Sequence, residues 1–138
     1  RLFECGILPT EIGIEEKNIE GLNIRISSRE RAAIELLHLT PRLYSFDEIP
    51  LILSSLGSLR GNLLNELLIL CSSEKAKRLI LYFGEKQNHS WYKNIDQEKM
   101  KIGTSLLKIA HREGKYISKY KLSIPKDYVI ENEHDIKF

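Results

Sequence analysis

The sequence of 138 residues predicts an α+β fold with about four packed helices and a small antiparallel sheet. Three observations indicate it. Apolar and polar residues alternate over residues 10–26, as in a half-buried hairpin, and again from Tyr120 to Pro125. Between these stretches, apolar residues recur at helical spacing in four segments. Apolar residues make up 42% of the chain and charged residues 29%, which is a globular and not a disordered composition.

The first expected element is a β-hairpin in TEIGIEEKNIEGLNIRI, residues 10–26. Its isoleucines and leucine fall at alternating positions on both sides of Glu20-Gly21, which is a typical tight-turn dipeptide. The alternation predicts that one face of the hairpin is buried. We also expect the hairpin to share its sheet with the strand that ends at Pro125.

Four helices are expected next. Ser27-Ser28-Arg29-Glu30 fits a capping box in which Ser27 accepts from the first turn and Glu30 reaches back, and this helix stops at Thr40-Pro41. A second box, Ser45 to Glu48, opens a short helix that ends at Leu56-Gly57. A third helix runs from about Asn62 to Cys71, with leucines on one side.

The fourth helix follows Ser72-Ser73 and lies in the basic stretch KRLILYFGEKQNHSWYKNI, residues 77–95. Its core face is predicted to hold Ala76, Leu79, Ile80 and Phe83, at spacings of i, i+3, i+4 and i+7. Leu81 falls outside that face, so we expect the helix to be covered on more than one side. Gly84 costs a helix roughly 1 kcal/mol against Ala, which indicates close approach of a neighbouring element. Trp91 is expected in the core.

Bulk features set the domain boundaries and the compartment. We expect one domain over residues 1–126 and an acidic, partly disordered tail over residues 127–138. Cys5 and Cys71 lie too far apart in sequence for a CxxC pair and are expected to be reduced thiols. The sequence has no signal peptide and no apolar run near the ~20 residues of a membrane span, so we expect a cytoplasmic protein.

Positive charge is concentrated in one segment. Residues 75–126 carry 13 Lys and Arg against 4 Asp and Glu, a net charge of +9 between two acidic regions. This pattern indicates a polyanion or an acidic protein as partner, and the alternative is a solvated lysine-rich surface. We expect the basic residues to gather on one side and to hold a phosphate backbone without reading bases. The candidate contacts are Lys75, Lys77, Arg78, Tyr82, Lys86, Lys108, Arg112, Lys115, Lys119 and Lys121, of which Lys75, Arg78, Tyr82 and Lys86 are predicted to form an exposed stripe on the fourth helix.

The sequence contains no recognisable catalytic motif. The sequence has no glycine-rich phosphate loop, GxSxG, HExxH or EF-hand pattern, and its four histidines lack metal-like spacing. Glu85, Lys86 and His89 imitate an acid–base cluster only weakly. We therefore expect a protein without enzymatic activity, metal or cofactor.

Four stretches resemble a known family. The stretch from Lys77 to Ile95, the Ile102-Gly103 step and GKYISKYKLSIPK from Gly114 to Lys126 are similar to the C-terminal domain of AbiEi-type antitoxins of bacterial type IV toxin–antitoxin systems, which act in abortive infection. GLNIRISSRERAAIELLHL, residues 21–39, is similar to the family's hairpin strand and the helix start that follows it. The likeness covers residues 2 to 126, without the winged helix that commonly precedes this domain.

The resemblance implies an antitoxin that counteracts a nucleotidyltransferase-like toxin and contributes to repression of its own operator. In relatives a basic Gly-Lys-Arg patch follows the Leu-Gly step, whereas Thr104 to Leu107 stand there in this chain, which argues against a DNA contact by that loop. One alternative is an accessory domain of a transcriptional regulator that holds the DNA backbone. Another is a small hydrolase or nuclease, which would need carboxylates clustered around a pocket.

Overall fold

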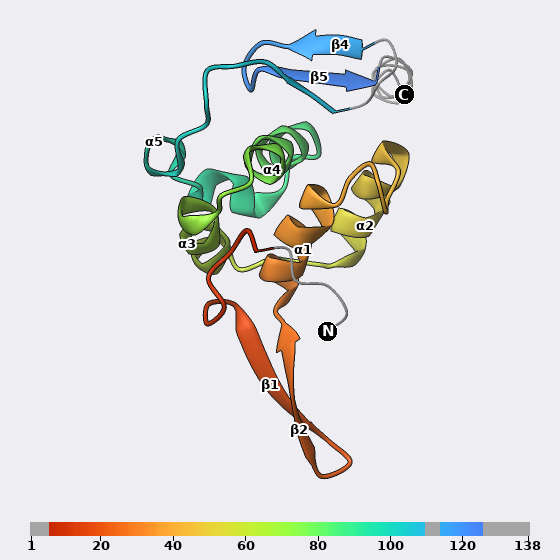
Figure 1. Cartoon of the computed structure of the whole chain (residues 1–138), viewed down its shortest axis with the longest axis vertical. Coiled ribbons are helices and arrows are strands. Elements are labelled where there is room, and N and C mark those ends of the chain that lie inside the picture. The colour runs from red at the N-terminus through yellow and green to blue at the C-terminus, as the bar shows by residue number, and fades with distance from the viewer. Residues whose placement is uncertain (1–5, 110–113, 126–138) are drawn as a thin grey trace.

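A computed structural model describes residues 6–109 and 114–125 of the chain (Figure 1). The predicted α+β class is confirmed, with two separate small sheets and five α-helices among the described residues, four of them of seven residues or more. The strands are β1 (Ile14–Ile19), β2 (Leu22–Ser27), β3 (Leu107–Lys108), β4 (Gly114–Ile117) and β5 (Leu122–Pro125). The α-helices are α1 (Arg29–His38), α2 (Ile49–Ser55), α3 (Gly61–Leu70), α4 (Glu74–Lys86) and α5 (Gln97–Met100), and two 3-10 turns are η1 (Phe46–Glu48) and η2 (Ser90–Asn94).

Serine residues begin α1, η1 and α4, as the sequence predicts, with one correction. The N-cap of α1 is Ser28 and not Ser27, because the Ser28 hydroxyl accepts from the Arg31 N–H at 3.2 Å. Glu30 does not reach back to the cap, since its buried carboxylate bonds Arg60 of the following segment. The second box is confirmed, because the Ser45 N–H donates to the Glu48 carboxylate.

Helix α4 is the centre of the core. Figure 1 shows it between the C-terminal strands on one side and α1 on the other. The predicted core residues Leu79, Ile80 and Phe83 are fully buried, and so is Leu81, so the expected coverage on more than one side is confirmed. Phe83 also contacts Phe46 of η1, with ring centroids 5.1 Å apart, which ties the α2 region to the same core.

Gly84 lies where η2 returns across α4. A methyl group at Gly84 would come within 2.5 Å of Cζ3 of Trp91, a distance that real Cβ atoms do not tolerate. Trp91 is 2% exposed, and His89 stacks on its ring with centroids 4.9 Å apart. The predictions of a core tryptophan and of close approach at Gly84 are therefore both confirmed.

The hairpin β1–β2 projects from the helical body (Figure 1). Its strands pair antiparallel from Ile14↔Ser27 to Ile19↔Leu22, and the predicted turn is confirmed at Glu20 and Gly21, with φ of 53° and 84°. The prediction of a buried face is wrong for its outer part. Ile19 is 51% exposed and Leu22 68% exposed, because no other element covers the tip among the described residues.

The C-terminal strands form a sheet of their own. Strand β5 lies between β3, to which it runs parallel, and β4, to which it runs antiparallel. The prediction that the hairpin and the strand before Pro125 share one sheet is wrong, because β3 and β4 occupy the two edges of β5. Periodicity predicts that a segment is a strand, but the choice of its partner depends on which backbone edges meet in the fold. The predicted tail over residues 127–138 lies outside the described residues.

Candidate functional site

The basic stripe predicted on α4 is mostly internal. Arg78 is 2% exposed, Lys77 7% and Tyr82 6%, so the prediction that Arg78 and Tyr82 are exposed is wrong. The reason is that the segment over residues 100–105 and the turn before β5 cover Lys77 and Arg78, while Phe46 of η1 lies beside Tyr82, with ring centroids 6.5 Å apart. Charged residues at helical spacing indicate a solvated face only if nothing else covers them, and the sequence does not show that cover.

Arg78 holds three parts of the chain together. Its Nε and Nη2 atoms donate to the Glu74 carboxylate oxygen Oε1 at 3.1 and 2.9 Å. Its Nη1 atom donates to the carbonyl oxygens of Ser105 at 2.6 Å and Lys121 at 3.0 Å. Arg78 therefore fastens the segment before β3 and the turn before β5 to α4, using the fixed fork of its guanidinium group.

Glu74 is the anionic centre of this clamp. Its Oε1 atom also accepts from the Gly103 N–H at 2.6 Å, and its Oε2 atom lies 2.9 Å from Nζ of Lys77. Lys77 donates in addition to the Lys101 carbonyl at 2.9 Å. Burial raises the pKa of Glu74, but the hydrogen bonds from Gly103, Lys77 and Arg78 outweigh it and the net pKa is lowered. These charges are partnered inside the domain.

A second fastening joins the far end of α4 to the turn between β4 and β5. The Tyr120 hydroxyl donates to the Glu85 carboxylate at 2.8 Å and bonds the Tyr92 hydroxyl at 2.5 Å. Lys119 donates to the other Glu85 oxygen. The hydrogen bond from Lys119 is the largest of the effects that lower the pKa of Glu85. Lys119, although exposed, therefore already has a carboxylate partner.

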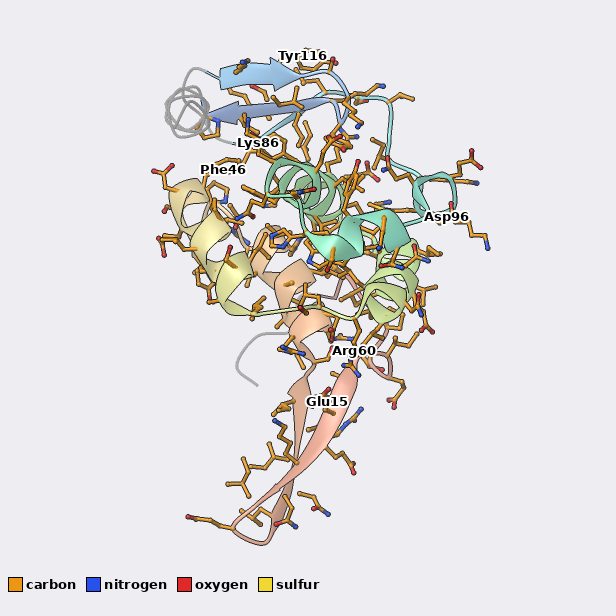
Figure 2. The ribbon with its side chains drawn as sticks, turned by 180° about the vertical axis from the view of Figure 1, so that it is seen from behind. Glu15, Phe46, Arg60, Lys86, Asp96 and Tyr116 are labelled. Carbon is orange, nitrogen blue, oxygen red and sulfur yellow. The ribbon has the colours of Figure 1, made fainter. Side chains whose placement is uncertain are left out.

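The remaining candidates lie nearer the surface. Lys75, Lys86 and Lys121 are half-buried, Lys108 and Lys115 are exposed, and Arg112 lies outside the described residues. Figure 2 shows Lys86 at the same end of the molecule as Tyr116 of β4, next to the C-terminal sheet. The role of these residues as contacts to an anionic partner stays a prediction.

Lys75 has cationic neighbours that the sequence analysis missed. The His38 Nδ1 atom lies 2.8 Å from the Ser73 hydroxyl, so the end of α1 meets the start of α4, where Lys75 is the second residue. Burial lowers the pKa of Lys75, and the positive charge of Arg42 lowers it further. Burial also lowers the pKa of His38, with Lys75 and Arg42 adding to the effect. We call Arg42 and Lys75, together with the adjacent His38, whose lowered pKa favours its neutral form, the α1–α4 cationic cluster.

No pattern in the sequence could have revealed this cluster. Arg42 belongs to the half of the chain with excess negative charge, and only the packing of α1 against α4 brings it to Lys75.

The base of the hairpin is anchored through Arg60. Its Nη2 atom lies 3.2 Å from the Glu15 carboxylate of β1 and 3.0 Å from the buried Glu30 carboxylate of α1. Figure 2 shows Arg60 and Glu15 side by side where the hairpin leaves the body. The Ser28 N–H also donates to the Gly13 carbonyl at 2.8 Å. These contacts fix the base and leave the outer half of the hairpin unsupported.

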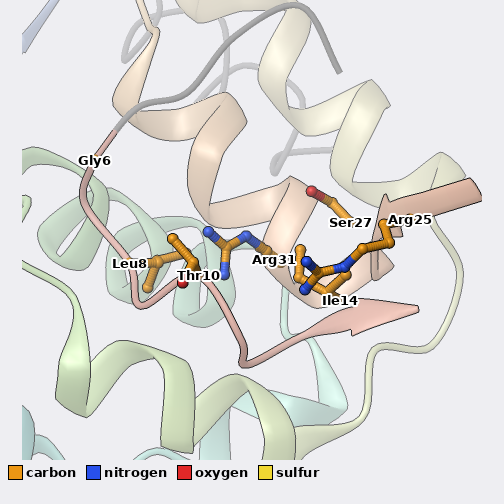
Figure 3. Close-up of a pocket in the computed structure, with 7 residues that line it drawn as sticks. All are labelled: Gly6, Leu8, Thr10, Ile14, Arg25, Ser27 and Arg31. Atoms are coloured by element: carbon orange, nitrogen blue, oxygen red, sulfur yellow. The ribbon is translucent and has the colours of Figure 1, made fainter. Parts of the chain in front are cut away.

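A pocket of about 200 Å³ opens beside this base (Figure 3). It is lined by Gly6, Leu8, Thr10, Ile14, Arg25, Ser27 and Arg31. Its two cations already have partners. Arg31 donates to the carbonyls of Pro9 and Ile12 and lies 3.5 Å from Glu35, while Arg25 lies 3.5 Å from Glu11. The charges of Arg25 and Arg31 are balanced by these carboxylates, so nothing in the pocket indicates an anionic ligand.

We next consider whether the described residues include a metal site or a reactive nucleophile. Over residues 6–109 and 114–125, no group of three or more His, Cys, Asp or Glu side chains is placed to hold a metal ion. Cys71 is buried, and burial raises the pKa of its thiol, which disfavours the reactive thiolate. No helix in these residues is long and apolar enough to span a membrane.

The structure defines the protein as a small α+β domain with a cationic cluster near its surface and a projecting hairpin that exposes apolar residues. Comparison with known families then gives the identity at the level of the family. The family described as "Transcriptional regulator, AbiEi antitoxin, Type IV TA system" matches residues 3–125, and the chain belongs to it. No curated protein and no solved structure matches the chain.

Proposed function

We propose that this protein is the antitoxin of a bacterial type IV toxin–antitoxin pair, that it counteracts a nucleotidyltransferase-like toxin in the cytoplasm, and that it contributes to repression of its own operator. The observation that carries the proposal is the family match over nearly the whole chain, residues 3–125. The family's description as a transcriptional regulator supports the operator role.

The α1–α4 cationic cluster is the part of the surface best suited to a DNA phosphate. Lys75 and Arg42 are both cationic, and the charge of Arg42 adds to the burial that lowers the pKa of Lys75, so a bound anion would relieve their repulsion. The nearby acidic residue Glu74 is already engaged by Lys77 and Arg78. Contacts of this kind position a duplex without reading bases, as the sequence analysis predicts.

A salt titration of operator binding tests this role. Each phosphate contact gives about −0.9 in the slope of log K against log salt, so Arg42→Glu with Lys75→Glu should weaken binding and reduce the slope by about 2. Lys93→Glu with Lys99→Glu is the matched control, because it makes the same charge change at two exposed lysines elsewhere. Equal loss in both double variants would show a net-charge effect only and would contradict a local contact.

The antitoxin role is tested separately by growth. Co-expression with a nucleotidyltransferase-like toxin encoded beside this gene should restore growth that the toxin alone arrests. Failure of a stably folded chain to restore growth would contradict the antitoxin proposal, whatever the DNA result. If the operator is bound but growth is not restored, the accessory DNA-backbone-binding domain, our second candidate function, is favoured.

A further inference from the structure

We propose that the hairpin β1–β2 is a self-association surface, and that two copies of this chain pair antiparallel through the outer edge of β2 into a four-stranded intermolecular sheet. The proposal goes beyond the antitoxin function and does not depend on it. It rests on the exposure of the hairpin, on the different charge patterns of its two edges and on the register of its strands.

Exposure of apolar residues on the hairpin is the first observation. Register places Ile19 opposite Leu22, Lys17 opposite Ile24 and Glu15 opposite Ile26, and directly opposed residues share a face. One face therefore carries all three apolar residues of β2 together with Ile19, beside Lys17 and Glu15 of β1, and three of these apolar residues are 38–68% exposed: Ile19, Leu22 and Ile24. A two-stranded hairpin is only marginally stable alone in water, so exposed apolar residues at its tip indicate a contact.

Open backbone edges are the second observation. Among the described residues β1 and β2 pair only with each other, so each has an outer edge without a strand partner. The two-residue turn at Glu20 and Gly21 makes Ile19 and Leu22 a hydrogen-bonded pair, and such pairs alternate along the ladder. In β2 the backbone groups of Asn23 and Arg25 must therefore point outward, available to another strand.

Charge distinguishes the two edges. Strand β1 reads IEEKNI, and the outward backbone groups of β1 are those of Ile14, Glu16 and Asn18. The two longest registers that hydrogen-bond these groups to a second β1 set Glu16 opposite Glu16 or Lys17 opposite Lys17. Charged side chains of this kind are how edge strands avoid pairing. Strand β2 reads LNIRIS and has one charged residue, Arg25. The β2 edge is thus the one suited to a second copy.

One register of β2 against β2 satisfies all these conditions. Asn23 faces Arg25 of the partner subunit, and the two residues exchange two backbone N–H···O=C hydrogen bonds. The two-fold axis repeats this pair, so all the outward backbone groups of Asn23 and Arg25 are satisfied in both copies. Ile24 lies on the two-fold axis as a pair without backbone hydrogen bonds, and Leu22 faces Ile26 of the partner subunit. No like charges are opposed, whereas a shift of one step toward the base would set Arg25 against Arg25. A shift of one step toward the tip would set Asn23 against Asn23 but would leave only Leu22 to Ile24 paired within β2. In the proposed register the apolar residues of the two β2 strands form one continuous patch at the centre of the four-stranded sheet.

Cysteine cross-linking tests the register. Facing residues without backbone hydrogen bonds have Cα atoms about 4.5 Å apart, within the range of a disulfide. In a Cys5→Ser background, Ile24→Cys should give a covalent dimer under mild oxidation. Lys17→Cys is the matched control, at the same level and on the same face of the hairpin. In the proposed sheet its two copies are three strand spacings apart, roughly 14 Å, so it should not cross-link.

Sedimentation of the unmodified chain tests association itself. An interface limited to one hairpin is small, so we expect a reversible dimer with Kd of about 1–100 µM. Ile24→Lys should abolish it, because two lysines would face each other on the axis, while Asn18→Lys on β1 should not. A chain that stays monomeric at about 1 mM, higher oligomers in place of dimers, or equal cross-linking of Ile24→Cys and Lys17→Cys would each overturn the proposal.

Discussion

Two β regions of this domain differ in how they are held. The C-terminal sheet is fastened to α4 by Arg78 and Glu74 at one end and by Tyr120 and Glu85 at the other. The hairpin β1–β2 is anchored at its base, through Arg60 and Ser28, and its outer half is exposed. Charged residues thus stabilise the first region from within, while apolar residues of the second face solvent.

The difference shows that residue type alone does not assign a role. Arg78 has the charge of a surface contact and makes four hydrogen bonds inside the domain. Leu22 has the side chain of a core residue and is 68% exposed. Both placements have a physical reason. A buried charge such as that of Arg78 must be paired, and an exposed apolar patch such as that around Leu22 commonly marks a contact.

The largest effect should come from the core around α4, the helix to which the C-terminal sheet is fastened. Trp91→Ala should lower the free energy of unfolding by about 3–5 kcal/mol, because a large buried aromatic leaves a cavity. Ile19→Ala on the hairpin tip is the comparison and should change it by no more than about 0.5 kcal/mol. Urea unfolding followed by far-UV circular dichroism measures both, and equal losses would erase the distinction between the two regions.

Crowding at Gly84 should have a smaller effect. Gly84→Ala should cost about 1–3 kcal/mol although alanine favours helices, because its methyl group would meet Trp91. Trp91→Leu in the same chain should relieve the crowding, so the double variant should lose less than the two single losses added together. Strict additivity in urea unfolding would show that the two side chains do not compete for space.

Acid should destabilise the domain gradually, at the hairpin base through Glu30 and at the C-terminal sheet through Glu74 and Glu85. The pKa of Glu30, Glu74 and Glu85 is lowered from the ordinary value of 4.5, so the unfolded chain binds more protons than the folded one at acidic pH. Their contribution to stability is complete above about pH 4.5 and is lost as the pH falls through the folded values. Unfolding free energies measured from pH 7 to pH 3 should show this decline, and Glu74→Gln should make it shallower. An unchanged profile in that variant would contradict the role of Glu74.

Much of the fold was predictable because local patterns carry it. Helical spacing identified α1 to α4, the Glu20-Gly21 dipeptide identified the hairpin turn, and Gly84 pointed to a close neighbour. Strand partners were not predictable, because the sequence does not show which backbone edges meet.

The candidate site was less predictable than the fold for the same reason. Burial of Arg78 depends on a loop 27 residues away, and the neighbourhood of Lys75 and Arg42 depends on helix packing. Family membership over residues 3–125 was recognisable from the sequence, since it rests on a combination of many structural residues.

The central claim is that Arg78 serves the fold while the hairpin's apolar residues serve a contact outside it, and one measurement tests it directly. The free energy of unfolding is compared for Arg78→Gln and Leu22→Gln, in urea at a protein concentration below the dimer range. Arg78→Gln should lose about 3 kcal/mol, the low end for a broken buried ion pair because Glu74 is partly exposed, and Leu22→Gln should change by no more than about 0.5 kcal/mol. A small loss for Arg78→Gln together with a large loss for Leu22→Gln would contradict the account.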